Sequence, residues 1–280
     1  MVRYFIIAVL FYFFSCSGTK DSRILERILL SMDKKYSSIV NNPNDYYLQI
    51  AYTQIDRNSQ QEPVFTLHTF NVDNTKYFYP ASTVKLPAAV LALDKLRRYE
   101  SLSIDKDTKL TINSDKTWMS SMLGDSSSEN GEATIAQFIK KIFVVSDNDA
   151  FNRLYEFLGQ DHFNQRMWDL GYSETRMRHP LSIPLTAEQN KYTNSLSFFI
   201  NDKKILEQQM QFSSLPLTVN SVENLIGKSY MQSAELIDAP MDFSGKNFFN
   251  ISEQHLFLQQ IMFPRNINSD KKLYLRAEDF

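Results

Sequence analysis

Two strand-like runs near the start of the chain, followed by a long and mainly helical stretch, most constrain the possible folds. Residues 46–55 and 64–70 alternate apolar and polar side chains, which is typical of half-buried strands. Apolar residues recur at helical spacing over residues 21–36, 133–145, 150–158, 162–170 and 251–262. Two strands alone make a poor sheet. The order of segments therefore predicts an α+β fold, in which a mainly helical domain packs against an antiparallel sheet that this chain leaves incomplete.

The composition indicates a folded domain and argues against nucleic acid as a partner. Of the 280 residues, 43% are hydrophobic, which is enough to build a core. A net charge of −2 does not provide the basic surface that non-specific nucleic-acid binding needs. The four histidines lack the spacing of a metal motif, and a single cysteine permits neither an internal disulfide nor a cysteine-based zinc site. We therefore expect a monomer without a metal ion or other cofactor.

The first sixteen residues resemble the signal segment of a bacterial lipoprotein. Arg3 precedes an apolar run over residues 4–14, and eleven residues of helix rise only about 16 Å, roughly half of a hydrocarbon core. Cys16 follows at the expected cleavage point. In lipoproteins this cysteine is diacylated and becomes the mature N-terminus, and two acyl chains suffice for stable anchoring. The alternative is a plain signal peptide with an incidental cysteine.

This resemblance predicts a lipoprotein signal over residues 1–16 and a polar tether over residues 17–21. Lipid on Cys16 would anchor the mature protein to the bacterial cell envelope, on the periplasmic or outer-membrane side. The expected location is therefore outside the inner membrane.

The pair Ser82 and Lys85 is the first candidate for catalytic chemistry. Several Ser-x-x-Lys pairs occur, among them Ser17/Lys20, Ser31/Lys34, Ser82/Lys85 and Ser269/Lys272. Of these, only Ser82 follows a strand and a proline-containing turn and opens a long apolar helix over residues 86–96. Both side chains share one helix face, and a lysine among apolar neighbours loses its proton more easily, so it can activate the serine. The alternative is an N-cap serine beside a solvated lysine.

Ser146-Asp147-Asn148 is the second candidate, and it lies between two helical segments. A turn that caps the helix starting near Ala150 would explain this tripeptide without any chemistry. That backbone role leaves the Ser146 hydroxyl free to face a cleft, so both roles are compatible.

Together, the two motifs resemble those of class A β-lactamases and penicillin-recognising serine hydrolases. The motif-bearing stretches are Tyr79-Pro80-Ala81-Ser82-Thr83-Val84-Lys85-Leu86-Pro87 and Val145-Ser146-Asp147-Asn148-Asp149-Ala150-Phe151-Asn152. The order of the motifs and the 64 residues between the two serines are also similar to the family. With the weaker similarity over residues 170–177, the resemblance covers roughly residues 24–177.

The resemblance implies a β-lactamase-like fold and a serine acyl-enzyme mechanism. The family pattern makes Ser82 the nucleophile, Lys85 the group that accepts or relays its proton, and Ser146 the proton donor to the leaving nitrogen. Asn148 would bind the Lys85 amine and the substrate amide. The backbone N–H of Ser82 would be one oxyanion donor.

Two elements of the family pattern are absent from their expected places. Lys116-Thr117-Trp118 precedes the second motif, and Gly245-Lys246-Asn247 has the right distance but no strand pattern around it. We therefore expect the third motif and a second oxyanion donor to be missing, and the domain over residues 22–280 to be truncated at its C-terminus. The position of the Ω-loop glutamate holds Leu181, which cannot activate water. Glu188 could replace it in a longer loop; the alternative is a solvated glutamate.

The sequence thus predicts a lipid-anchored, β-lactamase-like serine hydrolase acting on a β-lactam or a related amide. One alternative is a penicillin-binding peptidase of the D-Ala-D-Ala type acting on peptidoglycan stem peptides. Another is a non-catalytic lipoprotein that retains the fold. The expected partners are such a small molecule or peptide, and a membrane through the N-terminal lipid.

Overall fold

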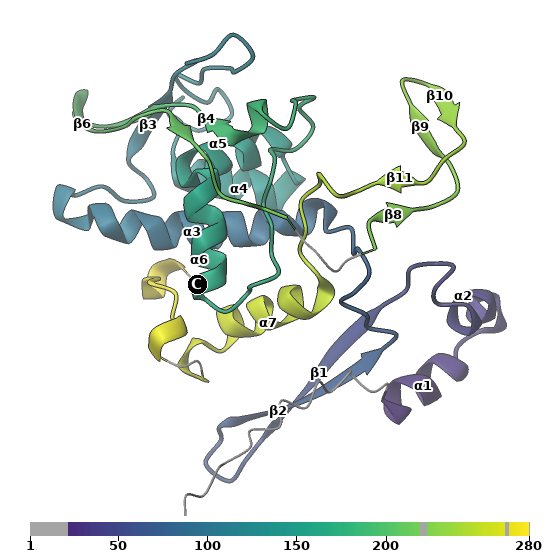
Figure 1. The fold of residues 1–280 in the computed structure, drawn as a ribbon. Helices are drawn as coiled ribbons and strands as arrows, with labels where there is room; N and C mark the ends of the chain where they lie inside the picture. Colours follow the sequence, from purple (N-terminus) through teal and green to yellow (C-terminus); the bar gives the residue numbers. More distant parts are fainter. Residues whose placement is uncertain (1–21, 219–222, 267–268, 280) are drawn as a thin grey trace, which may run out of the picture. The chain divides into compact units, whose positions relative to one another are not determined.

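The computed structural model describes residues 22–218, 223–266 and 269–279, and the chain divides into two compact units, residues 1–73 and 74–280 (Figure 1). The predicted signal segment, the tether and Cys16 lie outside the described residues. Within the described part, no helix is both long and apolar enough to span a bilayer.

The first unit contains two short helices and one β-hairpin: α1 (Arg23–Leu30), α2 (Ser37–Asn41), β1 (Ile50–Arg57) and β2 (Pro63–Phe70). The strands pair antiparallel, with Ile50 opposite Phe70 and Arg57 opposite Pro63. Ser22 caps α1, and its Oγ lies 2.8 Å from Nδ1 of His68 on β2. These contacts confirm the two strands predicted from alternating side chains.

The helical pattern over residues 21–36 is interrupted in the structure. Helix α1 ends at Leu30, and a separate 3₁₀ turn begins after Asp33, whose carboxylate accepts the Lys35 N–H. An aspartate that bonds a backbone N–H two residues ahead favours a new helical start over continuation. The prediction of one continuous helix over residues 21–36 was therefore wrong. The spacing of apolar residues alone does not show that a helix cap lies within the range.

Five longer helices form the core of the described part of the second unit: α3 (Lys85–Leu96), α4 (Ile135–Val145), α5 (Asn148–Leu158), α6 (Gln160–Asp169) and α7 (Ile251–Met262). Helix α5 contacts α3, α4 and α6 and buries Phe151, Leu154 and Leu158 completely. Helix α7 adds Phe257 to the same core. The helical periodicity predicted α4 to α7 closely, because each has an apolar stripe that faces this core. The apolar run over residues 86–96 predicted α3.

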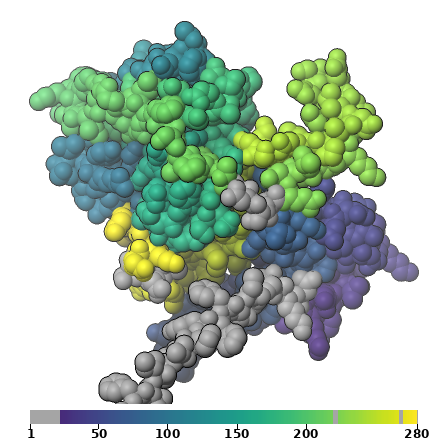
Figure 2. Space-filling model, in the orientation of Figure 1, coloured from purple at the N-terminus to yellow at the C-terminus, as the bar shows by residue number. Residues whose placement is uncertain are grey.

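Short antiparallel strands accompany these helices: β3 (Lys109–Ile112), β4 (Tyr192–Thr193), β5 (Leu196–Ile200), β6 (Lys203–Gln208), β7 (Gln211–Phe212), β8 (Leu225–Ile226), β9 (Tyr230–Gln232), β10 (Glu235–Ile237) and β11 (Met241–Asp242). Strand β5 lies between β3 and β6, and the remaining pairs are β4–β7, β8–β11 and β9–β10. The hairpin ending in β9 and β10 projects from the helices of its unit (Figures 1 and 2). The α+β class and the antiparallel pairing are confirmed.

A buried ion pair fastens the segment after α7 to the helices. Arg166 on α6 pairs with Asp94 on α3 at 2.9 Å between Nε and Oδ2. The same carboxylate accepts the backbone N–H of Tyr274 at 2.6 Å. Both side chains of the pair are nearly inaccessible to solvent, so the pair also fixes the path of the residues around Tyr274.

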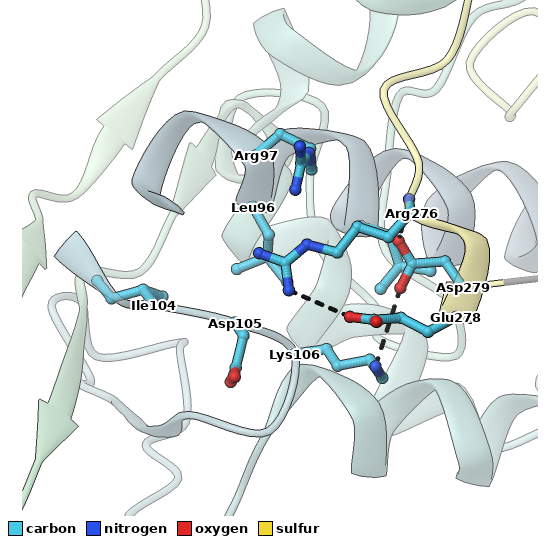
Figure 3. A pocket seen from close by; sticks show the side chains of 9 residues that line it. Leu96, Arg97, Ile104, Asp105, Lys106, Arg276, Glu278 and Asp279 are labelled. Carbon is cyan, nitrogen blue, oxygen red and sulfur yellow. Dashed lines mark hydrogen bonds and ion pairs between the residues drawn. The ribbon is translucent and has the colours of Figure 1, made fainter. Parts of the chain in front are cut away.

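The last described residues form a small polar cluster beside the end of α3. Figure 3 shows Arg276 pairing with Glu278 at 3.2 Å and Lys106 pairing with Asp279 at 4.0 Å. The space between these side chains is about 20 Å³, which is room for a single water molecule. This pocket is therefore a packing gap and not a ligand site.

Candidate active site

Ser82 lies in a 3₁₀ turn, Ala81–Val84, that leads directly into α3. Side chains three residues apart eclipse each other in a 3₁₀ turn, and Lys85 Nζ accordingly lies 3.2 Å from Ser82 Oγ. Ala81, immediately before the serine, has a φ of 44°. A left-handed conformation costs an L-residue about 1–2 kcal/mol, so the tertiary structure must enforce this turn. The predicted position of Lys85 within hydrogen-bond reach of Ser82 is confirmed.

Ser146 and Asn148 reach the same lysine from the turn between α4 and α5. Ser146 ends α4 with a φ of 54°, and Asp147 caps α5 by accepting the Ala150 N–H. Lys85 Nζ lies 3.0 Å from Ser146 Oγ and 2.7 Å from Asn148 Oδ1, and it also donates to the Ser146 carbonyl oxygen. Ser146 Oγ is 3.2 Å from Ser82 Oγ. The predicted convergence is confirmed, and the catalytic roles stay predictions.

Burial makes the Lys85 amine easier to deprotonate than that of an exposed lysine. The residue is only 3% exposed, and burial lowers its pKa below the ordinary value of 10.5, although the Asp147 carboxylate opposes this shift. Two of the oxygens around Nζ, the Ser146 carbonyl and Asn148 Oδ1, can only accept hydrogen bonds. A neutral amine has two N–H groups for these two acceptors, and its lone pair then faces the Ser82 hydroxyl. The site can therefore take up the serine proton.

A loop after α6 faces this group of residues, and two asparagines on α5 hold it. Asn152 binds both main-chain groups of Leu181, donating to its carbonyl oxygen at 2.9 Å and accepting its N–H at 2.7 Å. Asn148 donates to Ser182 Oγ at 2.8 Å. Asn148 and Asn152 are four residues apart, so they lie on one face of α5. That face fixes the loop next to Lys85.

Ser182 is the third strained residue near Lys85, after Ala81 and Ser146. Its φ is 58°, again in the left-handed region. Because Lys85 occupies the oxygen of the Asn148 amide, the amide nitrogen must donate to Ser182. The Ser182 hydroxyl accepts that bond, so its own proton is available to a molecule bound in front of the loop.

A pocket of about 930 Å³ opens in front of Ser82, and Asn148 and Ser182 line it too. Its apolar wall includes Leu181, Ile183, Pro184, Leu185, Met241 and Phe243. Gly245 and Lys246, which follow β11, also line the pocket. Such a volume suits a small molecule or a short peptide segment. Among the described residues, no group of three or more His, Cys, Asp or Glu could hold a metal ion.

A comparison with protein-family models decides the assignment. The model described as the β-lactamase enzyme family matches residues 33–208, more than half of the chain. The chain belongs to the β-lactamase enzyme family. The match includes both motifs around Ser82 and Ser146 and the loop around Leu181. A search of curated proteins found no matching relative.

The two candidate positions for a deacylation base differ sharply within this β-lactamase-family structure. Leu181 lies against the hydrophobic core and lines the pocket, with its main chain fixed by Asn152. Glu188 is instead on the surface, with its side chain 62% exposed and paired with Lys191 at 2.7 Å. Among the described residues that line the pocket there is no carboxylate. Glu188 is therefore the solvated loop glutamate that the alternative prediction described.

The pocket lining includes His179 and Ser182, which the sequence did not single out, and Gly245 and Lys246, which were considered as a third motif and set aside. Lys246 is outside any strand, as predicted, yet it lies in the lining together with Ser82. The distance of Lys246 along the chain from Ser82 fits the third motif of the family. The segment around Lys246 was nevertheless set aside, because it has no strand pattern. Lys116, the other candidate of that type, does not line the pocket and instead lies over the Tyr192 ring.

Proposed function

We propose that this β-lactamase-family protein is a serine hydrolase that forms an acyl-enzyme on Ser82 with a β-lactam or a related amide. The observation that carries the proposal is the group formed by Ser82, Lys85 and Ser146. Their three side-chain polar atoms lie 3.0–3.2 Å apart, at the edge of a pocket large enough for such a substrate.

The first step is attack by Ser82. Neutral Lys85 takes the hydroxyl proton at Nζ while Oγ forms a bond to the substrate carbonyl carbon. The carbonyl oxygen becomes negative and receives a hydrogen bond from the Ser82 N–H, which lies at the start of its 3₁₀ turn and has no backbone partner among the described residues. The Ser146 carbonyl and the Asn148 amide oxygen then stabilise the lysine as a cation, because both accept its N–H groups.

The second step is release of the amine. Ser146 Oγ–H donates its proton to the substrate nitrogen as the C–N bond breaks, and Lys85 replaces that proton. The 3.0 Å distance between Lys85 Nζ and Ser146 Oγ permits this transfer without movement of either side chain. The products of acylation are an ester on Ser82 and a neutral amine, with Lys85 again unprotonated.

The third step, hydrolysis of the ester, lacks a visible base. The pocket lining offers Leu181 where the family pattern has a glutamate, and Glu188 points to solvent. The acyl-enzyme should therefore persist, which is also how a penicillin-binding peptidase behaves toward penicillin. This observation favours the peptidase as the second candidate, with a peptidoglycan stem peptide as its substrate.

The location at the cell envelope belongs to the same proposal. A diacylated Cys16 would keep the enzyme outside the inner membrane, where β-lactams and peptidoglycan peptides are both accessible.

Intact-mass spectrometry of the full chain after incubation with benzylpenicillin tests the function. We expect a mass increase equal to one penicillin on the wild type and on Ser31→Ala, which alters another Ser-x-x-Lys pair. Ser82→Ala should show no increase. No adduct on any of the three would refute the acyl-enzyme and leave the non-catalytic lipoprotein. Rapid return to the original mass with consumption of the drug would contradict the expected persistence.

A further inference from the structure

Asn247 is one of the residues that attach the pocket wall containing Gly245 and Lys246 to the loop before Leu181. Asn247 is 4% exposed, and its Oδ1 accepts the N–H groups of Arg178 at 2.7 Å and His179 at 3.1 Å. Its Nδ2 donates to the His179 carbonyl oxygen at 3.0 Å. Together with the backbone bridge between Arg176 and Phe248 and the bond from Arg178 to the Ser244 carbonyl oxygen, these bonds join two irregular segments 68 residues apart.

The His179 ring completes this attachment. Its Nε2 lies 3.2 Å from the backbone N of Asn247, and its Nδ1 lies 2.7 Å from the Pro180 carbonyl oxygen. A backbone N–H only donates and a carbonyl oxygen only accepts, so Nε2 carries no proton and Nδ1 carries one. The two partners therefore fit one tautomer of the neutral ring and conflict with the cation.

We propose that His179 is a positioning residue whose neutral ring holds the Gly245–Lys246 wall of the pocket in place, and that protonation at Nε2 releases this wall. Once Nε2 is protonated, it can no longer accept the hydrogen bond from the Asn247 N–H. Two N–H groups then face each other at this contact. Asn247 must then move, and with it the neighbouring Lys246. The inference rests on the proposed function in one respect, because the substrate of that reaction would contact this wall.

The charges around the ring determine the direction of the pH effect. Burial lowers the pKa of His179 below 6.5, the Pro180 carbonyl opposes this shift, and the cations Lys246 and Arg178 add to it. The pocket lining contains no carboxylate that could stabilise the protonated ring. Tyr77, which donates to the Asn247 carbonyl oxygen at 2.6 Å, stays protonated because burial raises its pKa. The wall is therefore held at neutral pH and is released at acidic pH, below 6.5.

The release of the wall can be tested without a substrate. Nuclear magnetic resonance of the full chain labelled with ¹⁵N-histidine should show the Nδ1-protonated tautomer of His179 at neutral pH, assigned by its loss in His179→Gln. As the ring titrates, the protection of the Asn247 N–H against hydrogen exchange should fall about two- to tenfold, the effect of one lost hydrogen bond.

Variants separate positioning from a merely structural role. The Gln side chain in His179→Gln can accept the Asn247 N–H but does not titrate, so protection should stay constant with pH. His179→Ala should lower the protection of the Asn247 N–H at every pH. His255→Gln on α7 should behave like the wild type. A proton on Nε2 at neutral pH, or Asn247 protection that ignores the titration of His179, would overturn the proposal.

Acylation by a fluorescent penicillin provides the second readout. The ratio of wild-type to His179→Gln acylation rates should fall about two- to tenfold from neutral to acidic pH, because only the wild type releases the wall. Taking the ratio cancels the titration of Lys85. A constant ratio would refute the role in the pocket. Absence of acylation in all variants, together with the expected resonance data, would refute the proposed function alone.

Discussion

Replacing Asn152 by alanine should weaken the pocket more than it weakens the fold. The change removes two hydrogen bonds to the Leu181 main chain, at 2.9 Å and 2.7 Å. Each contributes about 0.5–1.5 kcal/mol net, so the expected loss in the free energy of unfolding is about 1–3 kcal/mol. Leu181 is only half-buried, so water can replace part of what is lost.

Asn164 is a matched control, because it binds the main chain of Met177 in the same way. Its Nδ2 donates to the Met177 carbonyl oxygen and its Oδ1 accepts the Met177 N–H, both at 2.8 Å. Asn164 and Met177 are both fully buried, so water cannot replace the partners that the Met177 N–H and carbonyl oxygen lose in Asn164→Ala. At about 1–3 kcal/mol for each unsatisfied group, this variant should lose about 2–6 kcal/mol.

The two variants should therefore rank oppositely in two assays. Urea unfolding should show the larger loss for Asn164→Ala, whereas the rate of acylation by a fluorescent penicillin should fall about tenfold only for Asn152→Ala, equal to about 1.4 kcal/mol. The reason is that Leu181 precedes Ser182, which binds the Asn148 amide. Hydrogen exchange at the Leu181 N–H checks the local effect without a substrate. Unchanged protection there in Asn152→Ala, or equal slowing of acylation by both variants, would refute this reasoning.

Three further predictions concern single residues. Because burial lowers the pKa of Lys85 and the neutral amine is the base, the acylation rate should rise with pH and level off below 10.5; a rate still rising above that value would contradict this. Leu181→Glu should shorten the lifetime of the penicillin adduct by about 10²- to 10⁴-fold, with Leu181→Gln as the control; an unchanged lifetime in the Glu variant would show that the side chain cannot orient water. Cys16→Ser, expressed in a Gram-negative host, should move the protein from the membrane to the soluble periplasmic fraction, and an unchanged distribution would contradict the lipid anchor.

Local patterns predicted the elements that have one exposed and one buried face. Helices α4 to α7 belong to this group, because a buried stripe is visible in the sequence. Helix α3 has no exposed residue and was predicted from its apolar run, and the hairpin β1–β2 buries no apolar side chain although its strands were predicted from alternation. Strand β5 was missed because Leu196–Ile200 is nearly continuous in apolar residues, as expected for a strand flanked by two others. Strand β6 is rich in charge and has no clear alternation.

The same distinction explains which site residues were predictable. Ser82 and Lys85 are three residues apart, and Ser146 and Asn148 flank a helix cap, so both pairs are local patterns. His179 and Asn247 are hydrogen-bonded, and both lie outside helices and strands. No periodic pattern in the sequence therefore links the two residues. Only the folded chain brings them together, next to Lys246 in the pocket lining.

The three left-handed residues near Ser82 affect how this β-lactamase-family protein can change under selection. Ala81, Ser146 and Ser182 each retain a side chain in a conformation that glycine adopts without penalty. Selection for stability alone should therefore favour glycine at these positions, by about 1 kcal/mol each. At Ser146 and Ser182 that gain would remove the hydroxyls that contact Ser82 and Asn148. Thermostable variants obtained without an activity screen should thus lose the hydroxyl groups around Ser82 and Asn148 first.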